Sequence, residues 1–181
     1  MMDLVFDVDI YVLQTLYALR DLAATHLFIV VSEFGSSVTI FGLMVVVGLW
    51  LVVRKRVADA AGLAIAVCGS GATVLVLKYL VSRARPDIMY QAYTEGPFYS
   101  FPSAHATLSM ALYGYLAYLL MQTEPILRRR ILIILLPMLA LLVAFSRLYL
   151  GVHYLSDVVG GIAIGLVFNW IGTQVRLRLL K

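Results

Sequence analysis

Long apolar runs separated by short polar segments dominate this chain. Five of them, at residues 36–53, 57–80, 103–121, 131–149 and 154–175, approach the roughly 20 helical residues that cross a hydrocarbon core. Backbone polar groups must be satisfied internally in lipid, and these runs lack the alternation of barrel strands. The pattern therefore predicts an all-α, polytopic transmembrane helix bundle with five clear spans.

The first 34 residues are less regular. Residues 4–19 mix apolar side chains with Asp7, Asp9 and Gln14, which is typical of a helix lying in the membrane interface. Residues 22–34 are apolar but short, so they fit a half-helix, a re-entrant segment or part of a sixth span. We expect one membrane-embedded domain over residues 1–181, with residues 1–34 as its interfacial or re-entrant N-terminal region.

Composition agrees with the membrane interpretation. The chain is 62% hydrophobic and only 13% charged, whereas soluble domains carry about 25% charged residues. Its net charge of +4 does not indicate nucleic-acid binding, because the basic residues fall mostly in short loops between the apolar runs.

Those basic loops predict an orientation. Clusters at residues 54–56, 128–130 and 176–181 lie on one side if the spans alternate, and the positive-inside rule makes that side cytoplasmic. Loop 81–102 and the turn around residues 147–153 then share the opposite face. We expect a multi-pass protein of the cell inner (plasma) membrane whose site lies on the periplasmic or extracellular face.

Three polar patches fall in those outward segments. They read KYLVSRARP from Lys78 to Pro86, PSAH from Pro102 to His105, and SRLYLGVHYLSD from Ser146 to Asp157. Charged groups beside or inside membrane spans are expensive and usually functional. The topology predicts that the three patches meet at one membrane surface.

The patches are suited to phosphate chemistry. Lys78, Arg85 and Arg147 can neutralise an anion, and a guanidinium matches phosphate oxygens in geometry. Asp157 follows His153 by four residues, so both share a face if the segment is helical. A carboxylate on one imidazole nitrogen fixes the tautomer and leaves the other nitrogen able to attack. Alone, this pair could equally be a buried hydrogen bond at a helix start.

The second patch opens the third span. Ser103 is a candidate N-cap, and a helix N-terminus with free N–H groups is an anion site. His105 falls in the first turn, where it can face the same anion as an acid or base, although a lone histidine there is more often structural. Lys78 alone would be read as an interfacial anchor. Arg83 could share phosphate binding or be solvated, and the solvated side chain is favoured.

In this order and spacing, the three patches resemble the signature of the type 2 phosphatidic acid phosphatase family over roughly residues 30–175. The resemblance implies that His153 attacks phosphorus to form a phosphohistidine, that Asp157 orients it, and that His105 protonates the leaving alkoxide. The phosphate-binding residues it implies are Lys78, Arg85, Ser103, Ala104 through its backbone amide, and Arg147. It also implies that neither metal nor cofactor is used. Ala104 stands where glycine is commonest in the family.

The expected partners are therefore a lipid phosphate substrate and membrane lipids, with no nucleic acid and no obligate protein partner. Undecaprenyl diphosphate is the favoured substrate, and phosphatidylglycerophosphate, phosphatidate and phosphorylated lipid A are alternatives. A vanadate-dependent haloperoxidase would have a similar pocket, but such enzymes are soluble. A non-catalytic lipid transporter also fits intramembrane charges, but the chain lacks paired Gly/Pro-broken spans in matching halves.

Overall fold

The computed structural model describes residues 2–96, 99–122 and 127–181, and over these residues it is helical with no strand. The elements in chain order are α1 (Met2–Ala18), α2 (Leu22–Glu33), α3 (Ser37–Val53), α4 (Val57–Ala64), a π-helical turn η1 (Ile65–Gly69), α5 (Ser70–Val81), a 3-10 turn η2 (Ile88–Tyr90), α6 (Ala104–Met121), α7 (Leu127–Tyr149) and α8 (Leu155–Leu179). The all-α expectation is confirmed.

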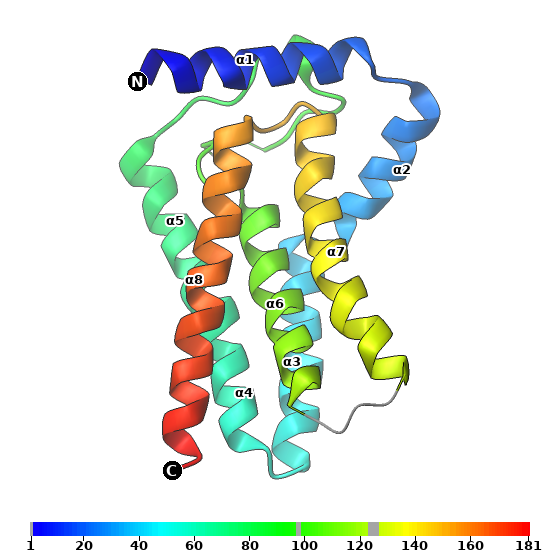
Figure 1. The fold of residues 1–181 in the computed structure, drawn as a ribbon. Helices are drawn as coiled ribbons and strands as arrows, with labels where there is room; N and C mark the ends of the chain where they lie inside the picture. Colours follow the sequence, from blue (N-terminus) through cyan, green and yellow to red (C-terminus); the bar gives the residue numbers. More distant parts are fainter. Residues whose placement is uncertain (1, 97–98, 123–126) are drawn as a thin grey trace.

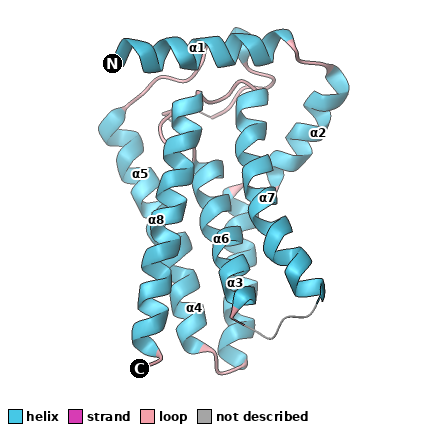
Figure 2. Cartoon of the chain, viewed as in Figure 1, coloured by secondary structure: helices cyan, strands magenta, loops and turns pink. Residues whose placement is uncertain are grey.

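The helices form a bundle closed at one end by α1. In Figure 1, α3, α4–α5, α6, α7 and α8 run lengthwise beside one another, and α1 lies across one end. The α5–α6 and α7–α8 connections gather beneath α1, as the loops in Figure 2 show. The position of α1 agrees with an interfacial helix. The three polar patches thus meet at the α1 end.

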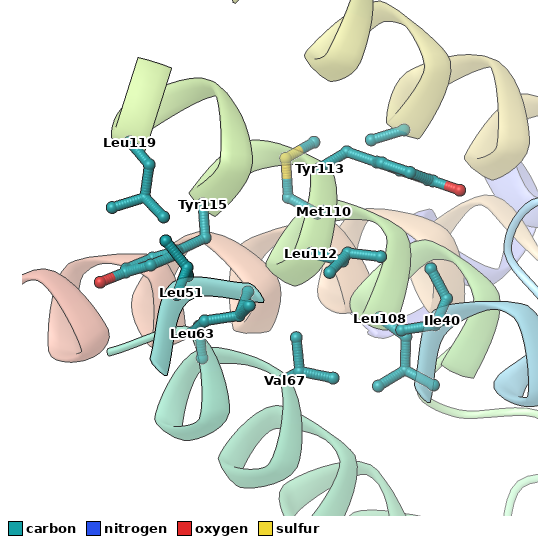
Figure 3. Packing of buried hydrophobic residues seen from close by; sticks show 12 residues of the cluster. Ile40, Leu51, Leu63, Val67, Leu108, Met110, Leu112, Tyr113, Tyr115 and Leu119 are labelled. Atoms are coloured by element: carbon teal, nitrogen blue, oxygen red, sulfur yellow. The ribbon is translucent and has the colours of Figure 1, made fainter. Parts of the chain in front are cut away.

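Helix α6 is the centre of the bundle. It packs against both α7 and α8, and most of its side chains from Ala106 to Tyr113 are buried. Its apolar residues do not keep to one face, which is expected of a helix surrounded by others. Leu108, Leu112 and Tyr115 of α6 meet apolar residues of α3 and of the α4–η1 region (Figure 3). This packing fixes the start of α6, where the second patch lies.

Length and hydropathy identify three described helices able to cross a membrane, namely 57–81, 129–149 and 155–179. A fourth span is possible if α2 and α3, bent by 40° at their junction, count as one broken span. A bent pair of this kind is either one broken span or a re-entrant loop, so the alternatives for residues 22–34 stay open. Helix α6, expected as a span, does not pass this criterion among the described helices. Its neighbours shield it from lipid, so it tolerates the polar side chains of Thr107 and Ser109, which are fully buried.

The end away from α1 carries the basic segments. The α3–α4 turn with Arg54–Arg56, the start of α7 and the C-terminus all lie there (Figure 1). Asp59 is buried at this end and pairs with Arg56 and Arg176. Polar groups therefore mark both ends of the bundle, but only the α1 end gathers the three patches.

Candidate active site

Helix caps position two of the patches. Ser103 is the N-cap of α6, where its hydroxyl accepts from the Ala106 amide at 3.5 Å, so the capping prediction is confirmed. The Ser103 amide in turn donates to the Asp157 carbonyl at 3.1 Å. This bond joins the start of α6 to the start of α8. The PSAH patch and the His153–Asp157 patch are thereby held side by side.

His153 and Asp157 form a buried pair. The imidazole lies just before α8, and its Nδ1 is 3.5 Å from Asp157 Oδ2; the two side chains are 2% and 0% exposed. The same oxygen accepts from the Tyr154 amide at 2.9 Å, which caps α8, and from the Ser100 hydroxyl at 2.5 Å. Because the carboxylate faces Nδ1, the ring proton belongs there, and Nε2 keeps its lone pair.

Ser100 was not anticipated from the sequence. Its hydroxyl is fully buried and lies 3.3 Å from His153 Nδ1 as well as against Asp157. It stands in the loop before the PSAH patch, 53 positions from His153, so no local spacing signals the contact. Ser100 thereby contacts both members of the His153–Asp157 pair.

Burial and nearby cations keep His153 neutral. Burial lowers the pKa of His153 to about 4; the hydrogen bond to Asp157 opposes this shift, and the charges of Arg147 and Arg85 add to it. At neutral pH the imidazole is therefore neutral and carries a single ring proton. A neutral imidazole with its proton on Nδ1 is the nucleophilic form.

One guanidinium lies beside Nε2, and the charge of a second acts on the same ring. Arg85 Nη1 is 3.2 Å from His153 Nε2 and donates to the Val152 carbonyl at 2.9 Å. Arg147 is completely buried, although it carries a charge. It pairs with Glu95 and Ser32 and donates to the Tyr93 hydroxyl at 2.6 Å. A fully buried arginine is retained only where it is paired, which is typical of an anion-binding site.

Glu95 occupies the space between these cations. One carboxylate oxygen pairs with Arg147, and the other lies 4.0 Å from Arg85 Nη2. Burial would raise the pKa of Glu95, but the charges of Arg147 and Arg85 outweigh it and lower the pKa below its ordinary value. The carboxylate is therefore ionised, and it contacts two of the cations that the sequence predicts to bind phosphate. Glu95 was not anticipated from the sequence.

Lys78 and the start of α6 complete the cationic pocket. The Lys78 side chain is 6% exposed and its ammonium donates to the Tyr99 carbonyl, so it is buried under the loop instead of reaching to the interface. The Ala104 N–H is among the donors that α6 cannot satisfy within itself. Positive φ angles among described residues occur at Lys55, Ser82 and Gly151 and not at Ala104, so alanine fits here without strain.

His105 lies in the first turn of α6, partly buried. Its ring has no hydrogen-bond partner among the described residues. The positive charges that act on it are those of Arg147, Arg85 and Lys78 in the pocket. The structure thus brings all eight sequence-predicted residues to one end of the bundle.

The prediction for Arg83 was wrong. The sequence favoured a solvated side chain, but Arg83 Nη1 donates to Asp157 Oδ1 at 2.7 Å, and Nη2 to Asp9 of α1 at 2.7 Å. The expectation failed because it could not show that α1 folds over this loop. A side chain in a polar loop is ordinarily solvated, but here a buried carboxylate lies on each side of it.

An apolar cavity reaches the pocket from the side of the bundle. Its volume is about 540 Å³, and it lies between α3 and α5, lined by apolar residues such as Phe41, Val74 and Leu75. Lys78 and Ala104 also line it. A ligand with an anionic head and an apolar chain would therefore find both halves of its site connected. No group of three or more metal-ligating side chains suited to an ion occurs among the described residues.

Comparison with known proteins gives a consistent set of relatives. The sequence model of the PAP2 superfamily matches residues 59–181. The chain is 31% identical over 144 residues to phosphatidylglycerophosphatase B of Bacillus subtilis, covering 78% of this chain and 70% of that protein. It is 42% identical over 107 residues to decaprenylphosphoryl-5-phosphoribose phosphatase of Mycobacterium tuberculosis, spanning 55% of this chain and about half, 54%, of that protein.

Solved structures agree. The crystal structure of the transmembrane PAP2-type phosphatidylglycerolphosphate phosphatase from Bacillus subtilis superposes with a TM-score of 0.86 at 25% identity, covering 96% of this chain and 87% of that one. Aquifex aeolicus LpxE superposes with a TM-score of 0.72 at 22% identity, covering 92% and 94%, which shows a shared fold.

Proposed function

This chain belongs to the PAP2 superfamily and is a membrane lipid phosphatase, and from that premise we propose that His153 carries the reaction through a covalent phosphohistidine. The observation that supports this proposal is a neutral, buried His153 with Arg85 Nη1 3.2 Å from its Nε2 and the charge of Arg147 also acting on its ring. Phosphoryl transfer needs a positioned nucleophile and neutralisation of charge on the phosphoryl oxygens. His153 Nε2 is the positioned nucleophile, and the nearby cations can neutralise the phosphoryl charge.

The first step forms the enzyme–phosphorus bond. His153 Nε2 attacks phosphorus while the bond to the leaving oxygen breaks. If that oxygen leaves as an alkoxide, the protonated form of His105 gives it a proton and becomes neutral. The imidazole becomes positively charged, and Asp157 on Nδ1 stabilises that charge. Lys78, Arg85, Arg147, Ser103 and the Ala104 amide hold the phosphoryl oxygens. Glu95 must leave the cations for the phosphate to bind.

In the second step, water attacks the phosphohistidine. The nitrogen–phosphorus bond breaks, inorganic phosphate forms, and His105 accepts the proton from water. His153 returns to its neutral state with the proton still on Nδ1. No step in this sequence needs a metal ion, because the cations of the pocket supply the charge.

The test of the chemistry is phosphate release from a detergent-dispersed lipid phosphate. We expect the same rate with and without EDTA, and inhibition by vanadate, whose five-coordinate form resembles the transition state. Strict dependence on Mg²⁺ would contradict the metal-free mechanism.

For the substrate, we propose undecaprenyl diphosphate first. The apolar cavity beside Lys78 suits a long chain, and the mycobacterial relative is named for a polyprenyl phosphate substrate. Phosphatidylglycerophosphate is the second candidate, favoured by the name of the Bacillus relative. A panel that adds phosphatidate and phosphorylated lipid A decides between them. The proposal requires the highest kcat/KM on the polyprenyl diphosphate, and a higher value on phosphatidylglycerophosphate would replace it.

We also propose that the site faces the outside of the inner (plasma) membrane. The basic segments at the end away from α1 support this orientation through the positive-inside rule. In a Cys68→Ser background, Met89→Cys marks the α1 end and Leu180→Cys the opposite end; both positions are exposed. In intact cells, a membrane-impermeant maleimide should label only Met89→Cys. Labelling of Leu180→Cys alone would reverse the orientation.

A further inference from the structure

A carboxylate of the N-terminal helix is buried against the site. Asp9 of α1 is 1% exposed. Its Oδ1 accepts from the Ser156 amide at 2.8 Å, and its Oδ2 accepts from the Ser156 hydroxyl at 2.6 Å and from Arg83 Nη2 at 2.7 Å. An interfacial helix needs no buried charge for its own stability. The role of Asp9 is therefore to be found in its contacts with Ser156 and Arg83.

Arg83 connects this carboxylate to the reacting pair. Its Nη1 donates to Asp157 Oδ1 at 2.7 Å and to the Ser156 hydroxyl at 2.6 Å, and its guanidinium lies 4.2 Å from the centre of the Tyr154 ring. The contacts run without a gap from Asp9 to Arg83, Asp157 and His153. All of these groups are largely or wholly removed from water, so their mutual interactions are weakly screened.

The charges along this line must balance for Asp157 to work. When Nε2 bonds to phosphorus, the imidazole becomes cationic and depends on the negative charge of Asp157. A guanidinium bound to Asp157 alone would cancel that charge. Asp9 offsets Arg83, so the three groups together keep one negative charge facing His153, while Arg83 still fixes the carboxylate in place.

We propose that Asp9 and Arg83 are positioning residues that set the orientation and effective charge of Asp157, which makes α1 a working part of the active site. This inference rests on the proposed role of His153. Helix α1 lies outside residues 59–181, which the PAP2 superfamily matches. The contribution therefore comes from a part of the chain that the family signature does not include.

The simpler alternative is that Asp9 only caps α8 through the Ser156 amide. Asp9→Asn separates the two, because asparagine keeps a carbonyl oxygen for that amide but loses the charge. Asp7→Asn is the matched control, since Asp7 is exposed on the same helix. Orienting residues of this kind typically contribute about 10–100-fold in activity. We expect Asp9→Asn to lower kcat by that factor, and Asp7→Asn to leave it unchanged.

Two readouts distinguish positioning from loss of structure. Neither Asp9 nor Arg83 contacts Lys78, Arg85 or Arg147 of the phosphate pocket. The KM and the inhibition constant of inorganic phosphate should therefore stay at wild-type values in Asp9→Asn. The double variant Asp9→Asn/Arg83→Gln removes both charges and restores the single negative charge of Asp157. It should therefore be more active than Asp9→Asn alone, which a capping role does not predict.

Three results would overturn the inference. The first is a wild-type kcat in Asp9→Asn, and the second is a loss of kcat accompanied by a rise in KM and in the inhibition constant of phosphate. The third is a double variant whose kcat is no higher than that of Asp9→Asn. If Asp9→Asn does not fold in detergent, Asp9→Glu keeps the charge and should retain more kcat than Arg83→Gln; equal or lower kcat counts against the inference. His153→Ala is measured in parallel. An active His153→Ala would refute the proposed function, whereas an inactive one with a wild-type Asp9→Asn refutes only this inference.

Discussion

Each end of the bundle holds a carboxylate between two arginines, yet the two clusters differ in kind. At the end away from α1, Asp59 pairs with Arg56 and Arg176, and Arg56 remains one-third exposed. At the α1 end, Arg147 is completely buried, and its partner Glu95 belongs to a loop instead of a helix. Only this second cluster surrounds a neutral histidine.

The difference shows what separates a structural ion pair from a binding site. At Asp59 the surplus positive charge is solvated through Arg56, so the cluster is complete as it stands. At the α1 end, the three cations Lys78, Arg85 and Arg147 face the carboxylates of Glu95 and Asp157, and their burial leaves these charges weakly screened by water. A buried pocket with surplus positive charge favours the binding of an anion that carries more negative charge than one carboxylate.

The largest effect should come from the nucleophile. His153→Ala removes the attacking nitrogen and should lower kcat by several powers of ten while the bundle still folds and inserts. Phosphate release by purified protein, normalised to the monodisperse fraction in detergent, measures it. Retention of more than about a tenth of wild-type activity, which is a loss of only ~1.4 kcal/mol in barrier stabilisation, would exclude this role.

Asp157→Asn should have a smaller but still large effect. The amide cannot stabilise the charged imidazole and favours the wrong tautomer, so we expect a loss of about 10²–10⁴-fold in kcat. The attacking nitrogen remains, and the variant should keep more activity than His153→Ala in the same assay. A loss equal to that of His153→Ala would mean that Asp157 does more than orient and stabilise the ring.

Glu95→Gln tests whether the loop carboxylate takes the place of an anion. Removing its charge ends its competition for Arg147 and Arg85, so the inhibition constant of inorganic phosphate should fall, by about threefold to tenfold for a gain on the order of 1 kcal/mol. Competition assays at fixed substrate measure the change. A weaker affinity for phosphate would show instead that Glu95 organises the two arginines.

The same type of change at the other end should affect stability and not catalysis. Asp59→Asn removes the carboxylate that pairs with Arg56 and Arg176, and we expect a lower midpoint of thermal unfolding, equivalent to about 1–3 kcal/mol because both arginines are partly exposed. At a temperature where the protein is folded, kcat/KM should stay within about twofold of wild type. A catalytic defect without a lower midpoint would remove the contrast between the two clusters.

Local patterns in the sequence predicted what depends on local structure. The apolar runs indicated the helices, and Ser103 was identified as the cap of α6 because an N-cap is defined by its own neighbours. The spacing of His153 and Asp157 indicated their contact, although His153 precedes α8 and the contact comes from the capping geometry of Asp157 instead of a shared helical face.

Contacts between distant segments were not predictable in this way. Glu95 lies 52 positions from Arg147, and Asp9 lies 147 positions from Ser156. Nothing in the local sequence of α1 indicates that Asp9 turns inward while Asp7 faces out, since both fit an interfacial helix. Which of them is buried depends on how α1 lies over the loops, and Arg83 was misjudged for the same reason.

Trapping the phosphoenzyme tests the central claim most directly. Purified protein is mixed with a lipid substrate labelled with ³²P in its terminal phosphate and quenched in alkali, in which phosphohistidine is stable and phosphoesters of serine are not. The account predicts label on the protein that survives alkali, is lost in acid, maps to the peptide containing His153 and is missing in His153→Ala. Turnover without any trapped label on the millisecond scale, or label that persists in His153→Ala, would contradict it.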